Sequence, residues 1–203
     1  MKVNAIVDIT TEKIIVDGKT VISGPDLLRS AYLSLKMDYP KFYKMDQLSK
    51  LGLLSVEYLM KIKGVDEKYG DDEIAVLFNN RDASACSDIE HLRAISNGIP
   101  SPSVFVYTLP NIVLGEIAIR NKWFGEQLCT VTNSPNYALL YQQCSALMHK
   151  GSTKAIILLI VNSLENTFDA CTVLIEKDGS VTGIPFTPKE LERIIKKHAR
   201  AKT

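Results

Sequence analysis

The chain has 203 residues, of which 46% are hydrophobic and 23% are charged, which is enough for one well-filled core. Its 24 basic and 23 acidic residues leave a net charge of +1, which argues against binding to nucleic acid or to a membrane surface. The first residues lack the apolar core of a secretory signal, and the longest apolar run, 155–161, is too short to span a bilayer. We therefore expect a single cytoplasmic domain over residues 1–203, without a membrane span.

Strand and helix signals alternate along the chain. The expected strands cover residues 3–9, 12–18, 73–78, 128–132, 155–161 and 170–176. The expected helices cover residues 25–36, 46–64, 88–95, 111–122, 136–149 and the segment after 187. Two prolines and a glycine predict a loop over residues 96–103. This alternation predicts the α/β class with a mixed sheet.

Several residues at element ends are strong boundary signals. Asp46 and Gly64 have the chemistry of an N-cap and a C-cap for the helix between them. Thr187, Pro188 and Glu190 form a start signal for the last helix. The apolar strands 155–161 and 170–176 predict burial on both faces of the sheet. The helix over 136–149 is apolar around much of its circumference, so we expect it to lie inside the protein.

The four cysteines give no sign of a metal or disulfide framework. Cys86, Cys129, Cys144 and Cys171 have neither CxxC nor cysteine–histidine spacing. We expect reduced and mostly buried thiols, and neither a metal nor a cofactor.

Three stretches together resemble the N-terminal half of a β-ketoacyl-ACP synthase. They are "KMDQLSKLGLLSVEYLM", "SVFVYTLPNIVLGEIAIRNKWFGE" and "LCTVTNSPN", and they occur in the family's order. The resemblance covers the chain from end to end but only one of the two halves of a family member. It implies a thiolase-like half-domain with a mixed, roughly five-stranded sheet and helices on both faces.

The resemblance places Ser134 where the family has its nucleophilic cysteine, at the start of a buried helix. A serine needs a base, and the family's assisting residues come from the half that this chain lacks. His149 lies about 20 Å along the same helix, and His198 has the sequence context of a solvated helix-end cation. His91 is the remaining candidate base. Ser134 followed by Pro135 also has the pattern of a helix cap.

Two thiols near this position are weaker candidates for a replacement nucleophile. Cys129 lies within the expected strand, and Cys144 lies in the middle of the expected helix, where packing is the simpler role. We therefore expect that catalytic chemistry is lost, and we assign no catalytic residue.

The resemblance implies a non-catalytic subunit like a chain-length factor, acting in fatty-acid, polyketide or aryl-polyene-type biosynthesis. Family dimers pair the strand before the nucleophile, here Leu128, Cys129, Thr130, Val131 and Thr132. The expected partner is a second copy or a full-length ketosynthase.

Two alternatives remain open. One is an acyltransferase or acyl-ACP hydrolase that uses Ser134. The other is a module that binds an acyl chain or acyl carrier protein without chemistry, through Arg120 and Lys122 beside Trp123 and Phe124.

Overall fold

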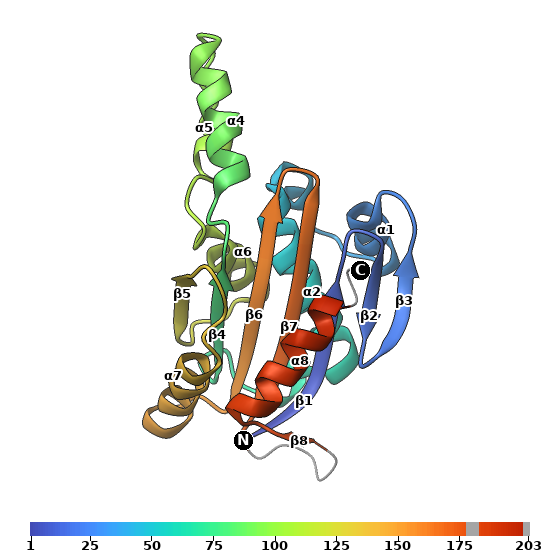
Figure 1. The fold of residues 1–203 in the computed structure, drawn as a ribbon, viewed down its shortest axis with the longest axis vertical. Coiled ribbons are helices and arrows are strands. Elements are labelled where there is room, and N and C mark those ends of the chain that lie inside the picture. Colours follow the sequence, from blue (N-terminus) through green and yellow to red (C-terminus); the bar gives the residue numbers. More distant parts are fainter. Residues whose placement is uncertain (178–182, 201–203) are drawn as a thin grey trace.

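An eight-stranded mixed sheet forms the centre of the computed structural model, which describes residues 1–177 and 183–200 (Figure 1). Its order is β3-β2-β1-β7-β6-β4-β5, and β8 pairs with β1. The strands are β1 (Lys2–Ile9), β2 (Lys13–Val16), β3 (Lys19–Ser23), β4 (Ile74–Asn80), β5 (Gln127–Val131), β6 (Ala155–Leu164), β7 (Thr167–Glu176) and β8 (Ile184–Pro185). Strand β4 runs parallel to β5 and β6, and the remaining pairs are antiparallel. The predicted α/β class and mixed sheet are confirmed.

The sheet has more strands than the roughly five that were expected. The two strands that the sequence did not predict are β3 and β8. Strand β3 is mostly exposed and has no clear alternation of apolar and polar residues, and β8 has only two residues. Both strands form because they pair with a neighbouring strand, β2 or β1. A local hydrophobic pattern does not define them, so the sequence signal for them is weak.

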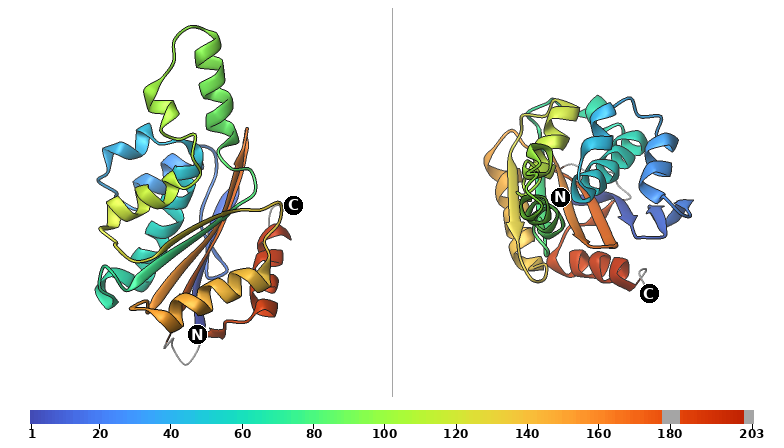
Figure 2. Two further views of the ribbon diagram at one scale, coloured as in Figure 1. Left: turned by 90° about the vertical axis from the view of Figure 1, so that its left-hand side faces the viewer. Right: turned by 90° about the horizontal axis from the view of Figure 1, so that it is seen from above.

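Helices cover both faces of the sheet (Figure 2). Helices α2 and α6 pack on one face, and α7 and α8 pack on the other. The helices are α1 (Leu27–Ser34), α2 (Gln47–Lys63), α3 (Val65–Lys68), α4 (Ala85–Ser96), α5 (Pro102–Phe105), α6 (Ile112–Asn121), α7 (Tyr137–Lys150) and α8 (Pro188–Arg200), with a 3-10 turn η1 (Pro40–Lys44). Strands β6 and β7 are buried along nearly their whole length between these layers, as their continuous apolar runs predict.

The predicted boundary residues of α2 and α8 are confirmed. Asp46 accepts a hydrogen bond from the Ser49 N–H at 2.9 Å, and Gly64 ends α2 in the left-handed region at φ 55°. Thr187 Oγ1 accepts the Glu190 N–H at 3.2 Å. These signals act within one helical turn, so tertiary contacts do not change them.

Helix α7 differs from the expectation. One face, with Leu140, Cys144 and Met148, is buried against the sheet and α8, but Leu139 on the outer side is 40% exposed. The prediction that this helix is enclosed is wrong, because within residues 1–177 and 183–200 no second layer lies over its outer face (Figure 2).

A helical arm projects from one end of the molecule (Figure 1). The arm contains α4, α5 and the connection between them. The predicted loop over residues 96–103 is only partly irregular, because α5 begins within it, with Ser101 as its N-cap. The arm exposes several large apolar side chains, namely Leu92, Ile95, Ile99, Phe105 and Val106. Within the described residues, no helix is both long enough and apolar enough to cross a membrane.

Candidate functional site

The corner between β5 and α7 is the segment where the family resemblance places the nucleophile. Strand β5 ends at Val131, and α7 begins at Tyr137. Asn136 caps the helix, because its side-chain oxygen accepts the Leu139 N–H at 3.0 Å. The expectation that Ser134 caps this helix is therefore wrong by two residues. Ser134 instead lies in the connection that precedes the cap.

The Ser134 side chain is exposed and has no hydrogen-bond partner among the described residues. It lines an open hollow of about 580 Å³ between the start of α7 and the start of α8. The charged residues of the hollow are Lys189 and Glu192. Glu192 is engaged with Lys196 at 2.6 Å, one helical turn away. A serine nucleophile needs a base within hydrogen-bond reach, and none of the described residues hydrogen-bonds to the Ser134 side chain.

None of the three histidines acts as a base toward Ser134 in this arrangement. His149 lies twelve residues beyond the start of α7, about 18 Å along the helix, and its Nδ1 lies 2.6 Å from the Ser145 carbonyl oxygen. His91 belongs to the arm, where its ring lies 5.3 Å from that of Phe105. His198 is only 3% exposed and lies between Asp8 and Asp169. The expectation that His198 is a solvated helix-end cation is wrong, since the last helix turns this side chain onto the sheet.

The thiols near the corner are poor nucleophiles. Cys144 is fully buried, and burial raises its pKa to about 12. Burial also raises the pKa of Cys129. Because the thiolate is the reactive form, the raised pKa values disfavour nucleophilic attack by either group at neutral pH.

Strand β5 lies at an edge of the sheet and pairs with β4 along one side. Thr132 donates its N–H to the Asn80 carbonyl of β4 at 2.9 Å. Alternate residues of a strand direct their backbone groups to the same neighbour, so the N–H groups of Thr130 and Leu128 face β4. Those of Cys129 and Val131 face away from the sheet. Val131 is also 48% exposed, so this edge is available for pairing.

The four residues proposed for carrier-protein contact do not form one surface. Trp123 is buried, and Arg120 approaches Glu57 at 3.4 Å and stacks on the Tyr39 ring at 5.3 Å. Lys122 and Phe124 are exposed. Arg120 is partly exposed but is engaged by Glu57 and Tyr39, so Lys122 and Phe124 are the more accessible of the four.

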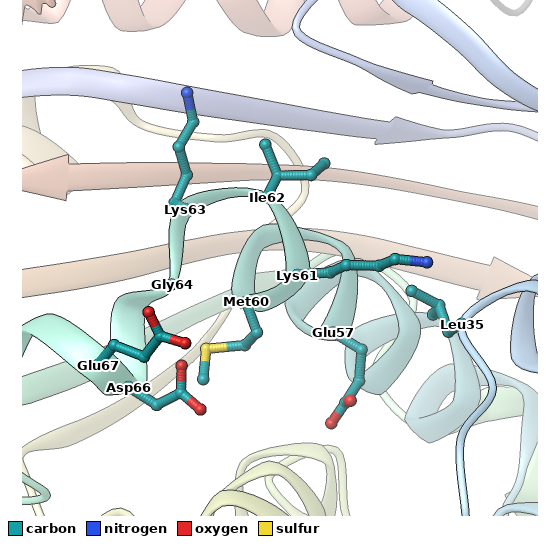
Figure 3. A pocket seen from close by; sticks show the side chains of 9 residues that line it. All are labelled: Leu35, Glu57, Met60, Lys61, Ile62, Lys63, Gly64, Asp66 and Glu67. Atoms are coloured by element: carbon teal, nitrogen blue, oxygen red, sulfur yellow. The ribbon is translucent and has the colours of Figure 1, made fainter.

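A second hollow, of about 610 Å³, lies at the end of α2 (Figure 3). Its lining mixes charges of both signs, with Lys61 and Lys63 on one side and Asp66 and Glu67 on the other. Burial raises the pKa of Glu57, which also lines it, although Arg120 opposes this effect. The hollow has no serine, cysteine or histidine, so we assign no reaction to it.

Comparison with known proteins shows that this chain is similar in fold, but not in sequence, to several solved structures. No family model and no curated protein matches the sequence. A chain in the structure described as "Ketosynthase (ApeO) in Complex with its Chain Length Factor (ApeC) from Xenorhabdus doucetiae" matches with a TM-score of 0.61 and 12% identity. The match covers 100% of this chain and 92% of that one, so the two are close in length.

Two other matches cover a smaller share of the known chain. A chain of "The ishigamide ketosynthase/chain length factor" has a TM-score of 0.68 and 14% identity over 91% of this chain. A chain of "AntDE:AntF (apo): type II PKS acyl-carrier protein in complex with its ketosynthase bound to the hexaketide" has a TM-score of 0.60 and 13% identity over 95%. This chain spans 64% of each of the two, just under two thirds. The chain therefore shares its fold with these chains of ketosynthase and chain-length-factor structures.

Proposed function

We propose that this chain is a non-catalytic ketosynthase-like subunit, similar to a chain-length factor, which assembles with a full-length ketosynthase. Its pathway would be of the fatty-acid, polyketide or aryl-polyene type. The observation that carries the proposal is the exposed side chain of Ser134, which has no hydrogen-bond partner among the described residues. The sequence resemblance places this serine at the family's nucleophile position. Such a corner retains the fold of the family without an activated nucleophile.

The open surfaces of the chain support an assembling role. The outer edge of β5 has unpaired backbone donors, and the outer side of α7 is partly apolar. Unpaired edges tend to add a strand from another chain. The full-length similarity to a chain of a ketosynthase and chain-length-factor complex agrees with such a role.

The first experiment tests the absence of chemistry. The purified protein is incubated with acyl-ACP and malonyl-ACP, and its intact mass is measured. We expect no covalent adduct and no condensation product, for the wild type and for Ser134→Ala alike. An acyl adduct that disappears in Ser134→Ala would show instead an acyltransferase or acyl-ACP hydrolase that uses this serine.

The second experiment tests the partner. Tagged protein is co-expressed with each full-length ketosynthase of the source organism, and the complexes are isolated by size-exclusion chromatography. We expect one ketosynthase to co-elute at equal stoichiometry and to elongate acyl-ACP only, or faster, in the complex. Co-elution with none of them and an unchanged elongation rate would contradict the proposal.

A further inference from the structure

Four polar side chains meet beneath α8, away from the corner at Ser134. Asp8 of β1 and Cys171 of β7 are direct partners in the antiparallel register, so their side chains share one face of the sheet. Asp169 lies two residues from Cys171 on the same face. His198 of α8 lies over that face and is only 3% exposed.

The His198 ring contacts both carboxylates, in two different ways. Its Nε2 lies 3.3 Å from Asp169 Oδ2, in a hydrogen bond, and Asp169 Oδ2 also accepts the Asn162 amide at 3.2 Å. Its Nδ1 lies 2.9 Å from Asp8 Oδ1, yet neither of these two buried atoms has a hydrogen-bond partner of acceptable geometry. When the ring is protonated, this contact is an ion pair without the alignment of a hydrogen bond.

A thiol completes this group. The ligand atoms of Asp8, Cys171 and His198 all lie within 4.8 Å of one another. Ligands of one tetrahedral zinc ion, at about 2.0 to 2.3 Å from the metal, lie roughly 3.3 to 3.7 Å apart. A contraction on the order of 1 Å would therefore bring all three onto one ion.

We propose that this cluster is a binding site for a zinc-class divalent transition metal, held by Asp8 Oδ1, Cys171 Sγ and His198 Nδ1. Sulfur and nitrogen ligands favour zinc over magnesium and calcium, which take oxygen. Asp169 is a positioning residue, because it accepts the proton on Nε2 and so leaves Nδ1 free to coordinate. A carboxylate in this position is the usual support of a metal-bound histidine. On binding, the proton of the Cys171 thiol and the Nδ1 proton of a cationic His198 are both released to solvent.

An entry path reaches the cluster at Asp8. A hollow of about 350 Å³ lies between the β1–β2 hairpin and α8, and Asp8 is part of its lining. The Asp8 side chain is 19% exposed, whereas the His198 side chain is 3% exposed. The carboxylate therefore faces the hollow, which also leaves room for water as a fourth ligand.

The site would fasten α8 to the sheet. Its ligands come from β1, β7 and α8, which are distant in the sequence, so metal bound there stabilises only the folded arrangement. This inference does not depend on the function proposed above. Without metal, His198 would be a cation that pairs with the carboxylates of Asp8 and Asp169. The test distinguishes a metal site from such a paired histidine.

The test uses the full chain, freed of metal with a chelator and titrated with Co²⁺ and with Zn²⁺. We expect one ion per chain, a Co²⁺ spectrum with a thiolate-to-metal charge-transfer band, and a higher midpoint of thermal unfolding with Zn²⁺. Cys171→Ser should remove the band, and Cys129→Ser on β5 is the matched control that should keep it. Asp169→Asn should weaken zinc affinity roughly 10- to 100-fold while the band remains.

Three results would overturn the inference. The first is the lack of any charge-transfer band in the wild type. The second is a band that persists in Cys171→Ser, which would place the metal elsewhere. The third is an unchanged unfolding midpoint with excess Zn²⁺, as expected for a histidine that only bridges the two carboxylates. The first and third are read on the wild-type protein, so they do not depend on whether a variant folds.

Discussion

Ser134 and Asn136 stand two positions apart, and either residue type can begin a helix. Pro135 after Ser134 favours the serine as cap, since proline suits the first helical position. In the structure the chain stays non-helical through Pro135, and the Asn136 side chain binds the Leu139 N–H. Local chemistry therefore predicts that α7 begins near this point, but the packing of its buried face against the sheet selects which residue caps it.

The first prediction separates these two residues. Asn136→Ala should lower the free energy of unfolding by about 1 kcal/mol, because the Leu139 N–H loses its acceptor. Ser134→Ala should change it by less than about 0.5 kcal/mol, because its exposed hydroxyl binds nothing in the described chain. Chemical denaturation of both variants measures the difference. A larger loss for Ser134→Ala than for Asn136→Ala would show that the serine is the cap.

At the scale of elements, the turn between α6 and β5 depends on a close backbone approach. Lys122 ends α6 in the left-handed region, and Phe124 donates its N–H to the Asp71 carbonyl at 2.8 Å. Gly125 then passes directly against the Ile74 carbonyl, where a Cβ would collide with backbone atoms. This contact sets where β5 enters the sheet beside β4.

The second prediction compares two glycines of this region. Gly125→Ala should destabilise the protein by about 2 kcal/mol or more, since the atoms in the way are backbone and have little freedom to move. Gly115→Ala, within α6 and with open space at its Cβ, should instead stabilise it by up to about 1 kcal/mol. Thermal unfolding of the two variants is the measurement. Equal effects would mean that the turn relaxes away from Ile74.

At the scale of the whole molecule, this chain leaves one side open. Helix α7 and the edge strand β5 both expose surface there, and the arm of α4 and α5 exposes more apolar side chains at one end (Figure 1). A monomer with such an edge is prone to pair or to aggregate. Pairing of residues 128–132 with a counterpart strand stays a prediction.

The third prediction concerns this assembly. Val131→Pro removes an N–H that points away from β4, so the fold should survive while pairing across the edge is lost. Thr130→Pro removes an N–H that faces β4 and should destabilise the fold itself. Light scattering and circular dichroism at micromolar concentration distinguish these outcomes. If the wild type is a monodisperse monomer and binds no ketosynthase, β5 is not the interface. The same conclusion follows if Val131→Pro leaves the assembly intact.

The sequence by itself determined the features that depend on neighbours along the chain. The cap of α2 at Asp46, its end at Gly64 and the start of α8 at Thr187 arise within one turn. The two-sided burial of β6 and β7 follows from their unbroken apolar runs. The alternation of strand and helix signals along the chain predicted the α/β class.

Only the tertiary structure decided which faces are covered. The apolar residues of α7 do not say whether a second layer lies over them, and in the described part of the chain none does. His198 has the sequence of a solvated helix end, yet it is buried because α8 places it over Asp8 and Asp169. Cys171 has no ligand spacing in the sequence, and the register of β1 and β7 brings it beside Asp8. Burial and side-chain clusters depend on contacts between distant segments, which local patterns do not encode.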